Sequence, residues 1–150
     1  MPDALAGLYQ QVILDHSRAR TGEGPLPDAA AEHFERNPTC GDEITVRIRL
    51  ASGSDRIEAL AWEGDGCSIS MASASVLTDL ATGRTLAEMG EVTETFRAMM
   101  RSKGQGEPDE EVLGDAVVFQ GVSKFVMRVK CAMLSWVALE ACSTKIAARA

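Results

Sequence analysis

A chain of 150 residues in which 45% are hydrophobic is long enough to bury a core without disulfide or metal staples. The net charge of −7 and the aromatic content of only 5% exclude a nucleic-acid-binding surface, because acidic proteins repel phosphates and few rings are available to stack on bases. The same charge argues against binding to anionic membranes, so we expect neither a nucleic-acid nor a membrane partner. The length predicts a single domain over residues 1–150.

Cellular compartment bears on the chemistry of the cysteines. No uninterrupted apolar run approaches the roughly 18 residues that a membrane span needs, and no basic segment followed by an apolar core opens the chain. We therefore expect a cytoplasmic protein. In a reducing compartment the four cysteines, which are Cys40, Cys67, Cys131 and Cys142, favour metal or sulfur chemistry over disulfides.

The first predicted element is an amphipathic helix over residues 4–15, in which Leu5, Leu8 and Val12 recur at helical spacing. A polar loop rich in Gly and Pro is expected over residues 18–31. His16 and His33 are interpreted as solvated or structural side chains and not as metal ligands.

The next elements are predicted to be strands. Residues 43–50 (EITVRIRL) alternate apolar and polar side chains, which is typical of a strand with one buried face. After a turn, residues 56–63 return as a second strand that pairs antiparallel with the first. A short third strand is weakly indicated around Phe34.

The second half of the chain is predicted to be mainly helical. A helix is expected over residues 68–82, and Thr85 with Glu88 indicates a capping box for another helix, which Gly90 interrupts before it continues to Met100. The remaining predictions are an exposed connection over residues 101–111, a segment of mixed propensity over 112–122 and a last helix over 126–147.

The loop from Asn37 to Asp42 carries the clearest chemical signal. Cys40 and Asp42 lie two residues apart, and Gly41 between them lets the backbone turn so that both can face one point. A soft sulfur and a harder oxygen on one loop suit a divalent metal of intermediate softness, above all zinc.

The other cysteines complete a candidate ligand set. Cys67 lies at a predicted helix N-terminus, where the helix dipole favours the thiolate, although a free buried cysteine at a simple turn is the alternative. Cys131 lies near the start of the last helix beside Lys130. Cys142 is about 16 Å further along that helix and is interpreted as a packing residue. Cys40, Asp42, Cys67 and Cys131 then form a tetrahedral zinc set.

The chain resembles the U-type iron–sulfur assembly proteins, and within them the SufU group. The resemblance covers nearly the whole chain and is carried by LYQQVILDH, NPTCGDEITVRI, EGDGCSIS, LGDAVVFQGVSKF and RVKCAMLSW. SufU is favoured over the related IscU scaffolds because Lys130, and not a histidine, precedes Cys131, and because an additional segment spans residues 99–122. Ser17, where a tyrosine is usual, departs from the pattern.

The resemblance implies fold and function together. It implies an α+β fold, a small antiparallel sheet of about three strands packed with helices. It also implies that Cys40, Asp42, Cys67 and Cys131 bind zinc, and that Cys40 accepts persulfide sulfur from a SufS-type, PLP-dependent cysteine desulfurase. The expected downstream acceptor is the Suf scaffold complex, and Arg128 is implied as a contact of the partner or of a thiolate.

Three functions remain open at the level of the sequence. The first is a zinc-dependent sulfur carrier that stimulates the desulfurase. The second is an IscU-like scaffold that assembles an iron–sulfur cluster on the same cysteines, since thiolates suit iron as well as zinc. The third is a structural zinc domain that mediates interactions.

Overall fold

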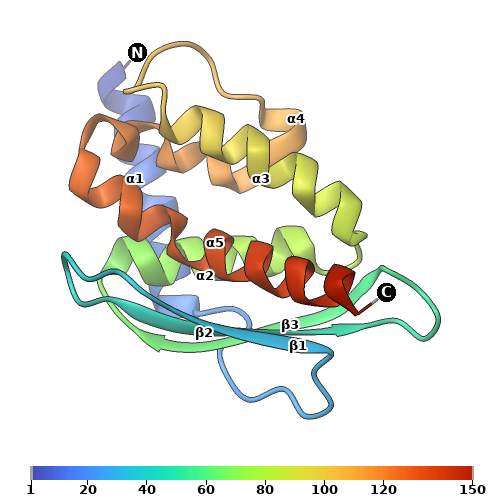
Figure 1. Cartoon of the computed structure of the whole chain (residues 1–150). Helices are drawn as coiled ribbons and strands as arrows, with labels where there is room; N and C mark the ends of the chain where they lie inside the picture. Colours follow the sequence, from blue (N-terminus) through green and yellow to red (C-terminus); the bar gives the residue numbers. More distant parts are fainter. Residues whose placement is uncertain (1, 150) are drawn as a thin grey trace.

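The computed structural model describes residues 2–149, and the side chains of the first residues, including that of Leu5, lie outside that description. Three strands form an antiparallel sheet in the order β1-β2-β3, and α2 and α5 lie against one of its faces (Figure 1). The predicted α+β class is confirmed. The elements are α1 (Pro2–Ala19), β1 (Ala31–Arg36), β2 (Glu43–Leu50), β3 (Ile57–Asp65), α2 (Ser68–Ala81), α3 (Leu86–Met100), α4 (Glu110–Leu113), the 3-10 helix η1 (Gly114–Lys124) and α5 (Val126–Ala148).

The sheet follows from the alternation of apolar residues in its central strand. Ile44, Val46 and Ile48 of β2 are each at most 1% exposed, whereas the residues between them face away from the core. Val46 pairs with Trp62 of β3, and Phe34 of β1 pairs with Thr45, so the weakly indicated third strand is confirmed. The register places the β1–β2 loop and the end of β3 at the same end of the sheet.

The longest helix, α5, covers the apolar face of the sheet. It packs against β1, β2 and α2, and its residues Trp136, Leu139 and Cys142 are almost completely buried. By length and composition alone α5 could cross a membrane. Its position in the centre of the domain explains the same apolar composition.

The structure corrects two local predictions. Gly90 does not interrupt a helix, because α3 runs without a break from Leu86 to Met100, beginning at the predicted capping box of Thr85 and Glu88. Leu8, predicted on the buried face of α1, is 58% exposed, and the partly buried apolar side chains of that helix are Tyr9, Val12 and Ile13.

The segment of mixed propensity is folded in the structure. It forms α4 and η1, and Ala116, Val117, Val118 and Phe119 of η1 belong to the core. This additional segment between the second and third cysteines is therefore part of the packed domain.

Candidate metal centre

The β1–β2 loop holds Cys40 at the surface and Asp42 in the interior. The Asn37 N–H donates to the Asp42 carbonyl at 2.8 Å, the Gly41 N–H donates to the Asn37 carbonyl at 2.8 Å, and the Asn37 Oδ1 accepts from the Thr39 N–H at 3.0 Å. Gly41 has φ +80°, a conformation that suits glycine. These bonds fix a tight loop in which Cys40 is exposed and Asp42 is only 7% exposed.

The start of α2 holds the carboxylate of Asp42. Cys67 is the N-cap residue, but its side chain makes no capping hydrogen bond; its N–H donates to Asp42 Oδ2 at 3.3 Å. The Ser70 hydroxyl donates to the same oxygen at 2.6 Å. Burial raises the pKa of Asp42, but the hydrogen bonds from Ser70 and Cys67 outweigh it and leave the pKa below its ordinary value. Asp42 is therefore ionised at neutral pH and presents an anionic oxygen to the centre.

Cys131 comes from the second turn of α5 and faces the loop. Its Sγ lies 3.7 Å from the Sγ of Cys40, and its residue is only 2% exposed. Burial, with the neighbouring thiols of Cys40 and Cys67, raises the pKa of Cys131 to about 12. A thiol in such surroundings ionises at neutral pH only when a cation is present, so metal binding would release a proton.

The donor set fits a tetrahedral zinc ion. One ligand atom each from Cys40, Asp42 and Cys131 lie within 4.8 Å of one another. Two sulfurs bonded to zinc at about 2.3 Å with tetrahedral angles stand about 3.8 Å apart, close to the separation of Cys40 and Cys131. Cys67 lies outside that tight group: its amide donates to Asp42, and its thiol lies 3.6 Å from the Ser70 hydroxyl. The structure thus brings Cys40, Asp42 and Cys131 together, and it places the backbone amide of Cys67 beside them.

Comparison with known proteins places the chain in a family. The profile of the NifU-like N-terminal domain matches residues 8–132. This chain belongs to the NifU-like N-terminal domain family. It is 44% identical over 134 residues to the zinc-dependent sulfurtransferase SufU of Bacillus subtilis, covering 89% of this chain and 87% of that protein.

Two further comparisons agree with that membership. The iron–sulfur cluster assembly scaffold protein IscU of Streptococcus pyogenes is 38% identical over 133 residues, covering 89% of this chain and 80% of that protein. The crystal structure of a candidate SUF-system scaffold protein from Fervidobacterium islandicum AW-1 superposes with a TM-score of 0.81 at 34% identity, covering 89% of this chain and 94% of that chain. The NifU-like fold therefore extends over nearly the whole molecule.

Four other residues of this NifU-like domain were considered in the sequence analysis, namely His16, His33, Cys142 and Arg128. His16 Nδ1 lies 2.8 Å from the Ser75 hydroxyl and His33 Nε2 lies 2.9 Å from Glu35, which agrees with structural roles. Cys142 is fully buried and its thiol donates to the Val46 carbonyl at 3.5 Å. Arg128 is exposed at the start of α5, and within the described residues its side chain makes no ion pair or hydrogen bond.

Sequence reasoning missed the roles of Ser70 and Asn37 in the centre of the NifU-like domain, whereas the glycines that flank Asp65 already predict a close approach of a second loop. Ser70 binds the carboxylate of Asp42, and Asn37 closes the loop. Gly66 gives room to Asp42, because a Cβ at Gly66 would lie 2.9 Å from its Cγ. The available signal for Ser70 was its position in the first helical turn after Cys67.

Proposed function

We propose that this protein is a zinc-dependent sulfur acceptor and carrier, folded as one domain, that takes persulfide sulfur from a SufS-type, PLP-dependent cysteine desulfurase. The observation that carries the proposal is the unequal exposure of two thiols 3.7 Å apart: Cys40 is exposed on a loop, whereas Cys131 is buried on α5. One thiol can meet a second protein while the others stay in place. The 44% identity to a zinc-dependent sulfurtransferase supports the same assignment.

The four proposed ligands have two roles: all four would bind zinc, and one of them also reacts with sulfur. Cys40, Asp42, Cys67 and Cys131 would hold zinc, which keeps thiolates deprotonated at neutral pH without redox chemistry when it is bound. Asp42 is held ionised by the Ser70 hydroxyl and the Cys67 amide. Cys131 and Cys67 are anchored on helices, so Cys40 is the residue on which sulfur is received.

The transfer itself is a thiol–persulfide exchange. The Cys40 thiolate attacks the outer sulfur of the donor persulfide, a Cys40 S–S bond forms, and the donor S–S bond breaks. The donor's inner sulfur leaves as a thiolate, and the transferred sulfur keeps its proton. No net oxidation or reduction occurs. The loop geometry at Asn37 and Gly41 presents the Cys40 thiolate outward for this attack.

The partners follow from the chemistry of the transfer. The desulfurase supplies the persulfide, and Arg128, exposed beside the centre, contacts that partner or the Cys40 thiolate. The sulfur then passes to iron–sulfur cluster assembly on the Suf scaffold complex. The protein acts in the cytoplasm.

The decisive experiment measures alanine production by a purified SufS-type desulfurase. We expect the wild-type protein, isolated colourless with about one zinc, to accelerate alanine release, and Cys40→Ala to abolish the acceleration. Cys142→Ala is the matched control, because that thiol is buried against Val46 away from the centre, and it should retain the wild-type effect. A Cys40→Ala protein as stimulatory as the wild type would refute Cys40 as the acceptor.

A second function is favoured by a specific observation, the 38% identity to an IscU scaffold. In that case the three thiols near Asp42 would assemble an iron–sulfur cluster, since thiolates are also cluster ligands. Reconstitution with ferrous iron and sulfide distinguishes the two functions. A stable brown product with sulfur-to-iron charge-transfer absorbance would favour the scaffold, whereas a protein that stays colourless and keeps zinc would favour the carrier.

A further inference from the structure

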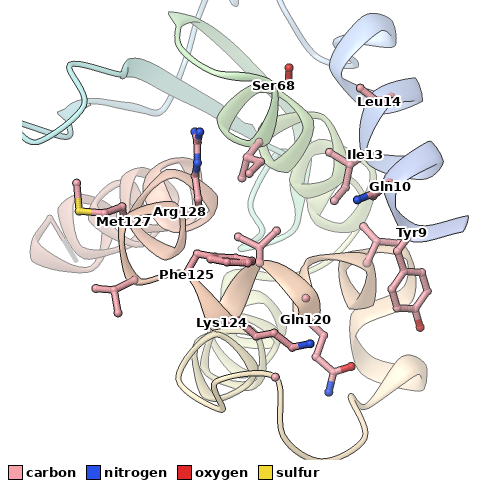
Figure 2. A pocket seen from close by; sticks show the side chains of 16 residues that line it. Tyr9, Gln10, Ile13, Leu14, Ser68, Gln120, Lys124, Phe125, Met127 and Arg128 are labelled. Carbon is pink, nitrogen blue, oxygen red and sulfur yellow. The ribbon is translucent and has the colours of Figure 1, made fainter. Parts of the chain in front are cut away.

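An apolar groove opens beside the metal centre. It has a volume of about 1160 Å³ and is bounded by α1, η1 and the start of α5, which are seen around the hollow in Figure 2. Among the side chains that the structure describes, six large hydrophobic ones are exposed, and four of these line the groove. They are Leu14 at 40%, Phe125 at 61%, Val126 at 71% and Met127 at 55% exposure. Such a concentration of exposed apolar side chains marks an interaction surface.

The groove is adjacent to the candidate metal centre. Ser68, which lines the groove, follows Cys67 directly in the chain. Met127 and Arg128 line its other side, and the Met127 carbonyl accepts a hydrogen bond from the Cys131 thiol at 3.7 Å. A protein that delivers sulfur to Cys40 therefore stands next to this groove while it does so.

The charges around the groove are of one sign. Lys124 and Arg128 are the charged side chains among the residues that line it, and both are exposed. The protein as a whole carries a net charge of −7, so this cationic rim is opposite in sign to the average surface. An occupant with apolar side chains and a carboxylate would be complementary to the groove. Two copies of this acidic chain would instead repel each other at long range.

The additional segment of residues 99–122 builds one wall of the groove. Val118, Gln120 and Val122 of η1 line it. Gly104 packs against the end of η1. Its N–H donates to the Ser123 hydroxyl at 2.7 Å, and the Lys124 side chain lies so close that a Cβ at Gly104 would be 2.6 Å from it. This wall is thus a fixed part of the surface.

We propose that the groove between α1, η1 and α5 docks an apolar, carboxylate-bearing segment of the cysteine desulfurase. The inference rests on the proposed function, since it names the surface to which that sulfur donor binds. Docking in the groove sets the concentration at which the protein responds to its donor, whereas the thiol chemistry takes place at Cys40.

Two substitutions on opposite walls test the docking without disturbing the fold. Val126→Asp places a carboxylate on the first residue of α5, where the helix dipole stabilises it. Leu14→Glu places a glutamate four residues before Arg18 on α1, a spacing that favours an ion pair. Phe34→Glu is the matched control, because Phe34 is 55% exposed but lies on β1 and does not line the groove.

Each variant is measured in two assays, sulfur uptake from a purified SufS-type desulfurase and sulfur uptake from glutathione persulfide. We expect Val126→Asp and Leu14→Glu to raise the concentration needed for half-maximal desulfurase stimulation at least tenfold. Uptake from glutathione persulfide should stay at the wild-type rate, and Phe34→Glu should match the wild type in both assays.

The outcomes separate the groove from the proposed function. Wild-type behaviour of both groove variants with the desulfurase would overturn the groove and leave the sulfur-carrier function standing. A wild-type protein that takes sulfur from neither donor would overturn the function, and the docking inference with it. A wild-type dimer that Val126→Asp converts to a monomer, with desulfurase stimulation unchanged, would show that a second copy occupies the groove and would also overturn the inference.

Discussion

At the scale of single residues, the absence of a side chain at Gly66 determines the position of Asp42 in the candidate centre. The Asp42 carboxylate passes directly over this glycine, and a Cβ there would lie 2.9 Å from Asp42 Cγ and 3.1 Å from Oδ2. Real Cβ atoms do not approach other atoms so closely, so Asp42 would have to move. The two hydrogen bonds that keep it ionised would be strained or broken.

We therefore predict that Gly66→Ala weakens zinc retention at least tenfold. Competition with a chromophoric chelator measures this affinity directly. Gly90→Ala in α3 is the control, because a Cβ at Gly90 meets no atom within 4 Å. That control should bind zinc like the wild type and gain up to about 1 kcal/mol of stability from its helix propensity. Equal zinc affinity in both variants would contradict the role given to Gly66.

At the scale of elements, a single serine makes hydrogen bonds between α2, which follows Cys67, and α5, which carries Cys131. The Ser73 hydroxyl of α2 donates to the Ala132 carbonyl of α5 at 2.6 Å and accepts from the Trp136 Nε1–H at 2.9 Å. Trp136 in turn stacks on Phe96 of α3 with ring centroids 4.1 Å apart. The relative register of α2 and α5 is thereby fixed next to the centre.

Replacing this serine should loosen both the fold and the site. Ser73→Ala leaves the buried indole N–H of Trp136 without its acceptor, so we expect a loss of about 1–3 kcal/mol in the free energy of unfolding. Urea denaturation followed by circular dichroism measures it. Ser143→Ala, at a half-buried position of α5, should change that free energy by less than about 0.5 kcal/mol. If Ser73→Ala lost no more free energy of unfolding than the control, the hydrogen bonds of Ser73 would not stabilise the packing of α2 on α5.

Elements with strong local signals could be predicted from the sequence. Alternation in β2 and the capping box at Thr85 depend on neighbouring residues only, and both predictions are confirmed. Gly90 was misjudged because the burial of Met89, Val92 and Phe96 outweighs the low helix propensity of one glycine. The 3-10 helix η1 had no periodic signal, since its formation depends on packing against α1, α3 and α5.

The candidate centre shows the same division. Residue type and resemblance to a known family predict the four ligands, and the structure brings three of them, Cys40, Asp42 and Cys131, into one group. The contacts that hold them were not found, because the hydrogen bond of Ser70 to Asp42 depends on how α2 meets the β1–β2 loop. Such a contact between distant segments leaves no spacing pattern in the sequence.

At the scale of the whole molecule, burial of one unused thiol makes stability depend on pH. Cys142 is fully buried, and burial raises the pKa of its thiol to about 11. An exposed thiol in the unfolded chain has a pKa of about 8.5. Below that pH both states are protonated and the stability is complete. As the pH rises from about 8.5 toward 11 the unfolded state alone ionises, so stability is lost.

We predict that the free energy of unfolding of the wild type falls between pH 8 and pH 10 more than that of Cys142→Ala. The difference approaches about 1.4 kcal/mol per pH unit within that window. Urea titrations under reducing conditions at both pH values measure it, and comparing the two proteins cancels groups that they share. Parallel pH dependence of the two proteins would contradict a buried, neutral Cys142.

The position of the third thiol in the chain bears on biosynthesis. Cys131 belongs to α5, which is translated after the sheet and the other helices that the structure describes, while Cys40 and Cys67 are translated much earlier. A nascent chain that ends before Val126 has the first two thiols and the carboxylate but lacks the third sulfur and the helix that packs on the sheet. Tight metal capture must therefore wait until α5 has been translated, and a polypeptide that stops before this helix has little means of sequestering zinc from the cell.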